Sequence, residues 1–160
     1  MTIKTILALS AAITAATALS ASPAEPGSPW TLSKVLADRE AKAAFDRMSK
    51  GQKLPAWVSS TATQTEGLPL KFAGQDAFVL HACKPHACST EQVALMYLPQ
   101  TRQMYGVLRK AGPKQNAEHL MWLNQQGGPE SIDGKTILYA ALTGSLSNHP
   151  RAFDFASAAQ

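Results

Sequence analysis

The chain has 160 residues, two cysteines and a formal net charge of +4 at neutral pH. Its 15 basic and 11 acidic residues are scattered, with no basic stripe interleaved with aromatic residues, so nucleic acid is not an expected partner. This length is about that of one ordinary domain, which can bury a hydrophobic core without help from many disulfides.

The N-terminus has the pattern of a secretory signal. Lys4 precedes an apolar run from Ile6 to Leu19, and several small residues follow as cleavage sites. The run is shorter than the roughly 20 apolar residues that a membrane span needs. We therefore predict a cleaved signal peptide over residues 1–22, a flexible leader over 23–30 and a single domain over 31–160. Without Lys4 the net charge is +3, and we expect the protein to be exported to the periplasm.

The first part of the predicted domain has helical periodicity. Apolar residues from Leu32 to Met48 recur at a spacing of 3.6, which predicts an amphipathic helix with a break near Asp38 and an end at Gly51. Residues 54–58 contain a proline that indicates an edge or a turn. Residues 59–66 are polar and rich in threonine, a composition typical of a loop or an exposed strand.

Strand patterns dominate the middle of the chain. Short apolar runs separated by turn residues predict strands over 68–73, 77–82, 92–98 and 103–109, with a hairpin turn at 74–76. Successive strands joined by short turns favour an antiparallel meander.

Helical patterns return near the C-terminus. Residues 117–124 predict a short amphipathic helix, and residues 135–142 predict a second helix that ends at Gly144. Phe153 and Phe155 alternate with polar residues, which predicts an edge strand or a contact with the core. The order of helix, strands and helix favours an α+β domain with a central antiparallel sheet.

Both cysteines lie in one hexapeptide between two predicted strands, Cys83-Lys84-Pro85-His86-Ala87-Cys88. Four intervening residues permit a disulfide, and export to an oxidising compartment favours one. Closing so small a loop stabilises a fold by about 2 kcal/mol at most, so we interpret the bond as a device that shapes the loop. Pro85 fixes its own φ and restricts Lys84.

Other chemistries for this segment stay open. His81, Cys83, His86 and Cys88 are all zinc-compatible, although four ligands within eight residues is an unfavourable spacing. A redox pair is not indicated, because the Cys-x-x-Cys spacing is absent. His119 and His149 are interpreted as surface or capping residues. No familiar catalytic or phosphate-binding motif is present, which favours a binding module over an enzyme, with no cofactor and no bound metal expected.

The hexapeptide resembles the hallmark Cys-Lys-Pro-His-Asp-Cys loop of the inhibitor of vertebrate lysozyme (Ivy) family. The resemblance extends through residues 54–58 and 122–124, is strongest over 131–150, and continues to Phe153 and Phe155. It implies a five-stranded antiparallel sheet packed with helices, from which a disulfide-closed loop protrudes between two strands. One position departs from the family motif, because Ala87 replaces the acidic residue.

The family resemblance also implies a target and a site. The chain would be a periplasmic inhibitor of C-type lysozyme, a factor in evading host defence, that inserts the Cys83–Cys88 loop into the enzyme's active-site cleft. His86 would meet the catalytic carboxylates, Lys84 would contact the rim and Pro85 would hold the loop's shape, with Ala87 as the fourth target-binding residue of the loop. Two alternatives stay open: a regulator of endogenous lytic transglycosylases, and a small periplasmic metal-binding protein. A homodimer is also left open.

Overall fold

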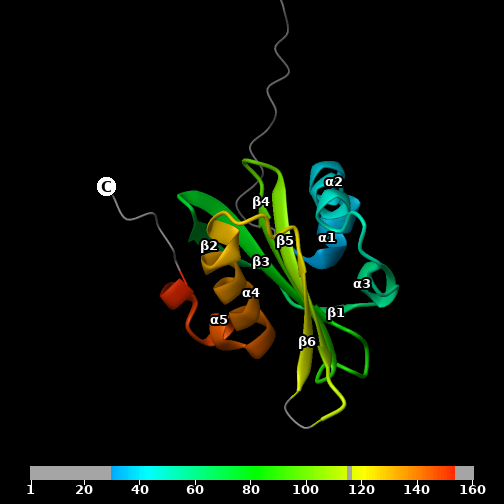
Figure 1. Cartoon of the computed structure of the whole chain (residues 1–160). Coiled ribbons are helices and arrows are strands. Elements are labelled where there is room, and N and C mark those ends of the chain that lie inside the picture. Colours follow the sequence, from blue (N-terminus) through cyan, green and yellow to red (C-terminus); the bar gives the residue numbers. More distant parts are fainter. Residues whose placement is uncertain (1–29, 115–116, 154–160) are drawn as a thin grey trace, which may run out of the picture.

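The computed structural model describes residues 30–114 and 117–153, which form a central sheet with helices on both faces (Figure 1). Helices α1 to α3 cover one face of the sheet, and α4 and α5 cover the other. The elements follow in the order α1 (Leu32–Ala37), α2 (Arg39–Met48), α3 (Trp57–Ser60), β1 (Thr63–Gln64), β2 (Leu68–Phe72), β3 (Gln75–Cys83), β4 (Glu91–Leu98), β5 (Gln103–Ala111), β6 (Glu118–Leu123), η1 (Pro129–Ser131), α4 (Asp133–Thr143), α5 (Ser145–Asn148) and η2 (Pro150–Phe153).

The strands confirm the predicted antiparallel sheet. Its order is β1-β3-β4-β5-β6, and β2 also pairs with β3, so six strands take part among the described residues. The sixth is the two-residue β1, which opposes the end of β3 through the pair Thr63 and Cys83. The predicted turn is shorter than expected: Ala73 and Gly74 adopt φ of 48° and 74°, and β3 already begins at Gln75. Two consecutive residues with positive φ are the usual requirement of a tight hairpin.

The predicted break near Asp38 is confirmed. Asp38 is both the C-cap of α1 and the N-cap of α2, and its carboxylate accepts hydrogen bonds from the backbone N–H groups of Glu40 and Ala41. Its extended backbone interrupts the helix, while its side chain satisfies donors that a helix start leaves free. The single amphipathic stretch thus folds as two helices that present one continuous apolar face.

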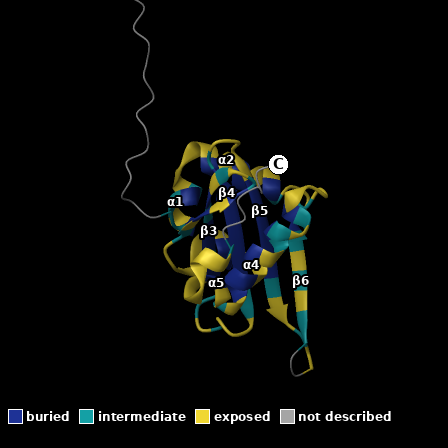
Figure 2. Ribbon diagram, turned by 90° about the vertical axis from the view of Figure 1, so that its left-hand side faces the viewer, coloured by how far each residue is buried: buried dark blue, intermediate teal, exposed yellow. Residues whose placement is uncertain are grey.

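The sheet separates two hydrophobic clusters. Val35, Phe45 and Leu95 belong to the cluster under α1 and α2, whereas Met96 and Ile137 belong to the cluster under α4. Figure 2 shows the buried residues in dark blue, concentrated in β3, β4 and β5 between the helical layers. Because these strands are covered on both faces, they read as nearly continuous apolar runs rather than as strict alternation.

The helix predicted over residues 117–124 is wrong, because residues 118–123 form strand β6. This strand pairs with β5 in a hairpin, with Leu123 opposite Gly106 and Glu118 opposite Ala111. Leu120 and Trp122 pack toward the α4 cluster, while Leu123 enters the α1–α2 cluster. That alternation of faces is the period of a strand, and pairing with β5 outweighs the weak helical pattern of so short a segment.

The C-terminal predictions are largely confirmed. Helix α4 includes residues 135–142, and Gly144 ends it with a left-handed φ of 80°. Phe153 lies in η2 and packs on the α4 cluster, as one of its two predicted alternatives had it. Phe155 lies outside the described residues, as do the predicted signal peptide and leader. Within residues 30–114 and 117–153, no helix has the length and apolar character that a bilayer crossing needs.

Candidate functional site

The hexapeptide forms a covalent ring at the end of β3, as the sequence predicted. Cys83 and Cys88 are joined by a disulfide, with their Cα atoms 4.8 Å apart. Cys83 is a buried residue of the sheet, whereas Cys88 is exposed in the connection to β4. The bond therefore fastens an exposed loop directly to the rigid part of the fold.

His86 lies exposed within a tight turn of this loop. The turn is closed by a hydrogen bond of 3.0 Å from the backbone N–H of Ala87 to the carbonyl of Lys84. His86 adopts a φ of 61°, a left-handed conformation that histidine tolerates better than most residues with a side chain. Pro85 precedes it with a fixed φ. The ring thus presents one imidazole to solvent from a defined backbone.

The departure at Ala87 leaves the hydrogen bonds of the loop intact. The carbonyl of Ala87 accepts hydrogen bonds of 2.9 Å from the backbone N–H groups of Thr90 and Glu91. It accepts a third from the hydroxyl of Thr90, at 3.1 Å. All these bonds use backbone atoms of Ala87, so any residue that adopts the same backbone conformation can make them.

One side of the loop is held by an ion pair. The Lys84 ammonium lies 2.6 Å from Oε1 of Glu91, whose other carboxylate oxygen accepts a hydrogen bond of 3.2 Å from the indole of Trp57. The backbone N–H of Lys84 also donates to the carbonyl of Glu91 at 3.0 Å. The hydrogen bond from Lys84 is the main cause that holds the pKa of Glu91 below its ordinary value. We call Lys84, Glu91 and Trp57 the lysine brace.

The other side is held by an arginine. Arg109 donates hydrogen bonds to the carbonyl of Ser89 at 3.1 Å and to the carboxylate of Glu118 at 2.7 Å. Tyr139 of α4 donates to the second oxygen of Glu118, also at 2.7 Å. The hydrogen bonds from Arg109 and Tyr139 hold the pKa of Glu118 below its ordinary value. We call Arg109, Glu118 and Tyr139 the arginine brace, which links Ser89, directly after the loop, to the helical layer.

Arg109→Met tests the arginine brace, because methionine keeps an apolar stem but makes no hydrogen bonds. We expect the free energy of unfolding to fall by about 1.5 kcal/mol, the lower range for hydrogen bonds to charged groups. Urea unfolding measures it. The control is Lys110→Met, since Lys110 is exposed and surface substitutions change stability by about 0.5 kcal/mol or less. Equal free energies of unfolding of the two variants would show that the arginine brace does not stabilise the fold.

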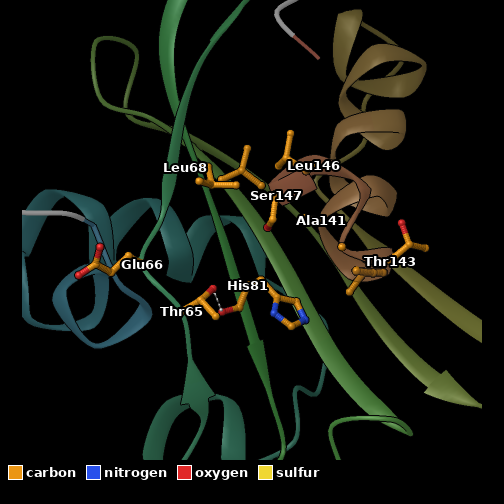
Figure 3. Close-up of a pocket in the computed structure, with 11 residues that line it drawn as sticks. Thr65, Glu66, Leu68, His81, Ala141, Thr143, Leu146 and Ser147 are labelled. Carbon is orange, nitrogen blue, oxygen red and sulfur yellow. Dashed lines mark hydrogen bonds between the residues drawn. The ribbon is translucent and has the colours of Figure 1, made fainter. Parts of the chain in front are cut away.

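His81 lies away from the loop, as a strand residue of β3. Its imidazole faces a hollow of about 350 Å³ between the sheet and the end of α4, where Nε2 is buried without a hydrogen-bond partner. Figure 3 shows Thr143 and Leu146 across this hollow, and Glu66 turned away from the imidazole. Thr65 donates hydrogen bonds to the backbone carbonyl of His81, from its N–H at 3.1 Å and from its hydroxyl at 3.3 Å.

This geometry bears on the metal hypothesis. The two cysteine sulfurs are bonded to each other, so neither is a free thiolate ligand. Residues 30–114 and 117–153 hold no group of three or more His, Cys, Asp or Glu side chains that could bind a metal ion. The hypothesis therefore loses two of its four proposed ligands, and His81 has a separate structural environment.

His81 also predicts a pH dependence of stability. Burial lowers the pKa of His81 from the ordinary value of 6.5, so the unfolded chain takes up the proton more readily than the folded one. The resulting stability is complete above about pH 6.5 and is lost as the pH falls below it. Between pH 6.5 and 5 the loss is at most about 2 kcal/mol, at 1.36 kcal/mol per pH unit.

The measurement is urea unfolding at pH 7 and pH 5 for the wild type and for His81→Leu. The wild type should lose more stability than the variant over this interval. Carboxylates with lowered pKa values, including Glu91 and Glu118, titrate at lower pH and act equally in both proteins. Parallel losses in both proteins would contradict a role for His81.

Comparison with known proteins covers most of the chain. Residues 40–136 match the sequence profile of the inhibitor of vertebrate lysozyme (Ivy) family. The chain belongs to the Ivy family. It is also similar to two curated proteins named "Inhibitor of vertebrate lysozyme", from Escherichia coli K12 and from Escherichia coli O157:H7. Each is 42% identical over 125 residues, which cover 78% of this chain and 79% of the relative.

Membership of the Ivy family confirms the prediction made from the hexapeptide. In the structure the six residues of the hexapeptide form one loop. The sequence analysis missed the supports of that loop. Trp57 lies within a segment that carried the family resemblance, and Glu91 closely follows the second cysteine, so both had a weak signal. Arg109, Glu118 and Tyr139 had none, because they meet the loop only through the folded sheet.

Proposed function

We propose that this protein inhibits C-type lysozyme by inserting the Cys83–Cys88 loop into the active-site cleft of the enzyme. The observation that carries the proposal is the exposed His86 on a covalently closed, doubly braced turn. Membership of the Ivy family supports the target. A loop that is already ordered loses less conformational entropy when it docks, which favours tight binding by a small contact surface.

The chemistry of the target suits an imidazole. Lysozyme cleaves its glycan with two carboxyl groups that flank the scissile bond. An imidazole N–H can donate a hydrogen bond to a carboxylate, and such charge-assisted bonds are stronger than neutral ones. Placed between the two acids, His86 would engage the catalytic groups and occupy the space of the sugar.

The charge near the loop supports the same target site. Lys84 and Arg109 are each paired with a glutamate, so these four charges compensate one another. Lys110 lies at the end of β5 and Lys114 in the connection that follows, both exposed. The end of β5 lies beside the segment that joins the ring to β4, since the backbone N–H of Ala111 donates to the carbonyl of Thr90 at 2.7 Å. The end of the sheet that carries the loop is therefore locally cationic, which complements an acidic cleft.

Each residue of the loop has a role in this proposal. His86 contacts the catalytic carboxylates, and Pro85 and Ala87 form the turn that carries it. Lys84 supports the loop through Glu91 and still exposes about 45% of its side chain, enough to reach the rim of the cleft. The periplasm, where a predicted signal peptide would deliver the protein, is an oxidising compartment that preserves the disulfide.

The test is a titration of purified protein against a C-type lysozyme and, in parallel, against a lytic transglycosylase from a bacterial periplasm. Both enzymes are assayed on the same cell-wall substrate. We expect stoichiometric loss of lysozyme activity and much weaker inhibition of the transglycosylase. Full lysozyme activity at saturating protein would overturn the proposal, and stronger inhibition of the transglycosylase would reassign the target to the bacterium's own enzymes.

A further inference from the structure

The disulfide-closed loop is too small to be the whole contact surface of a protein inhibitor. A stable interface between two proteins takes in about 20 to 30 residues on each side. The ring has six residues, and one of them, Cys83, is buried in the sheet. If the loop enters the cleft of lysozyme, a surface beside the loop must therefore contact the enzyme as well. Two surfaces flank the ring: the segment of α3 and β1, and the ends of β5 and β6.

The flank formed by α3 and β1 uses its polar groups within the fold. Residues 59–64 carry no charge. The hydroxyl groups of Ser59 and Ser60 donate to a backbone carbonyl of the same turn, at 3.3 and 2.8 Å. The side-chain amide of Gln64 donates to the hydroxyl of Ser33 at 2.9 Å and accepts from its backbone N–H at 2.8 Å. This flank therefore offers few hydrogen-bonding groups to a partner.

The other flank carries a row of polar side chains that crosses the sheet from the ring to the edge strand β6. The backbone N–H of Lys84 donates to the carbonyl of Glu91 at 3.0 Å. Glu91 lies directly opposite Lys110, and Lys110 lies directly opposite His119. Residues directly opposite each other share one face of a sheet. We call these four residues the cross-strand row, which spans about 14 Å as three inter-strand steps of about 4.8 Å.

The row lies just beyond the part of the sheet that α1 and α2 cover. Leu108 and Leu123 are on the same face and belong to the cluster under these helices. Lys110 and His119 lie nearer the strand ends and are exposed. Met121 lies between this pair and the cluster, and 37% of its surface is exposed. Figure 1 shows this end of β6 at the same end of the sheet as the connection from β3 to β4, so a protein that receives the loop can reach it.

The acids near the row are already bound. Glu91 belongs to the lysine brace, and Lys110 adds only a smaller attraction to it. Glu118 precedes His119 but points to the other face, where it belongs to the arginine brace. Lys110 forms no ion pair within residues 30–114 and 117–153. The ammonium of Lys110 and the imidazole of His119 can therefore donate to acceptors of a partner.

We propose that Lys110, His119 and Met121 form a second contact region for C-type lysozyme, beside the inserted loop. This proposal rests on the proposed function, because it extends the same interface. The wall of a cleft that binds a glycan carries hydrogen-bond acceptors for the sugar hydroxyl groups, and Lys110 and His119 supply donors to them. Met121 adds an apolar contact of a residue type that is enriched in interfaces. The loop then fills the catalytic centre while the second contact region binds one wall of the cleft.

The experiment measures the concentration of protein that half-inhibits a C-type lysozyme. We expect this concentration to rise about fivefold for Lys110→Gln and for His119→Ala, and about threefold for Met121→Gln. The matched controls are Lys50→Gln and His149→Ala, which should equal the wild type. Both control positions are exposed; Lys50 lies near the other end of β6, and His149 ends α5. The lysine and histidine variants should all keep the thermal unfolding midpoint of the wild type, because they change exposed residues.

Salt dependence distinguishes a charge contact from a change of shape. Contacts of exposed charges weaken as the ionic strength rises, so added salt should weaken inhibition by the wild type and by Lys50→Gln more than inhibition by Lys110→Gln. The same series includes His86→Asn, so that the two proposals fail separately. If the wild type does not inhibit, the proposed function is overturned. If the wild type inhibits and His86→Asn does not, but Lys110→Gln and His119→Ala behave like their controls, only the second contact region is overturned.

Discussion

His86→Ala should raise the concentration of protein that half-inhibits a C-type lysozyme about 100-fold, or about 2.7 kcal/mol. The physical reason is that truncating one partner of a buried, hydrogen-bonded contact leaves the catalytic carboxylates without their donor. The imidazole is the exposed side chain that the turn presents, and neighbouring backbone cannot replace it. Inhibition curves for wild type and variant, recorded side by side, give the ratio.

The backbone conformation of His86 requires a matched control. A φ of 61° costs alanine about 1 kcal/mol or more, so His86→Ala also destabilises the turn. Asparagine tolerates this conformation and keeps a polar side chain, but it is shorter and lacks the ring. His86→Asn should therefore keep the wild-type stability while losing most of the inhibition. Retained inhibition by His86→Asn would refute the assigned contact, whatever alanine does.

Removing the disulfide is the second change with a large expected effect. In the double variant Cys83→Ala/Cys88→Ala the free energy of unfolding should fall by about 2 kcal/mol, the loop-closure value for so small a ring. Inhibition should weaken by at least tenfold, because the loop must then be ordered when it binds. Alanine is chosen at Cys83 because this position is buried and a serine hydroxyl would lack a partner there.

Reductant separates the two consequences of the bond. Reduced wild-type protein should resemble the double variant in both stability and inhibition, and the double variant should not respond to reductant at all. Urea unfolding measures the first property and residual lysozyme activity the second. If the double variant inhibits as well as the wild type, then the lysine and arginine braces alone order the loop.

The strands and the long helices were predictable because their patterns are local. The apolar runs of β3, β4 and β5 are bounded by turn residues, and the periodicity of α1 and α2 was interrupted where Asp38 offered a cap. Strand β6 was not predictable in this way. It is six residues long, and its strand character arises from pairing with β5 and from two cores that accept alternate side chains.

In the candidate site, too, only the local features were predictable from the sequence. The disulfide and the exposed position of His86 were readable from six consecutive residues. The arginine brace was not, because Arg109, Glu118 and Tyr139 come from three different elements and meet only after the β5–β6 hairpin has formed and α4 has packed on it. Sequence spacing carries no information about such a contact until the register of the strands is known.

The two braces have a consequence for the use of this loop outside its own fold. The lysine brace reaches the hexapeptide from α3 and β4, and the arginine brace reaches Ser89, the residue that follows it, from β5, β6 and α4. A synthetic cyclic peptide with the same six residues would keep the ring and lose every one of these supports. The conformation of the loop is therefore not portable as a peptide, and a graft that is to keep it must carry the end of the sheet as well.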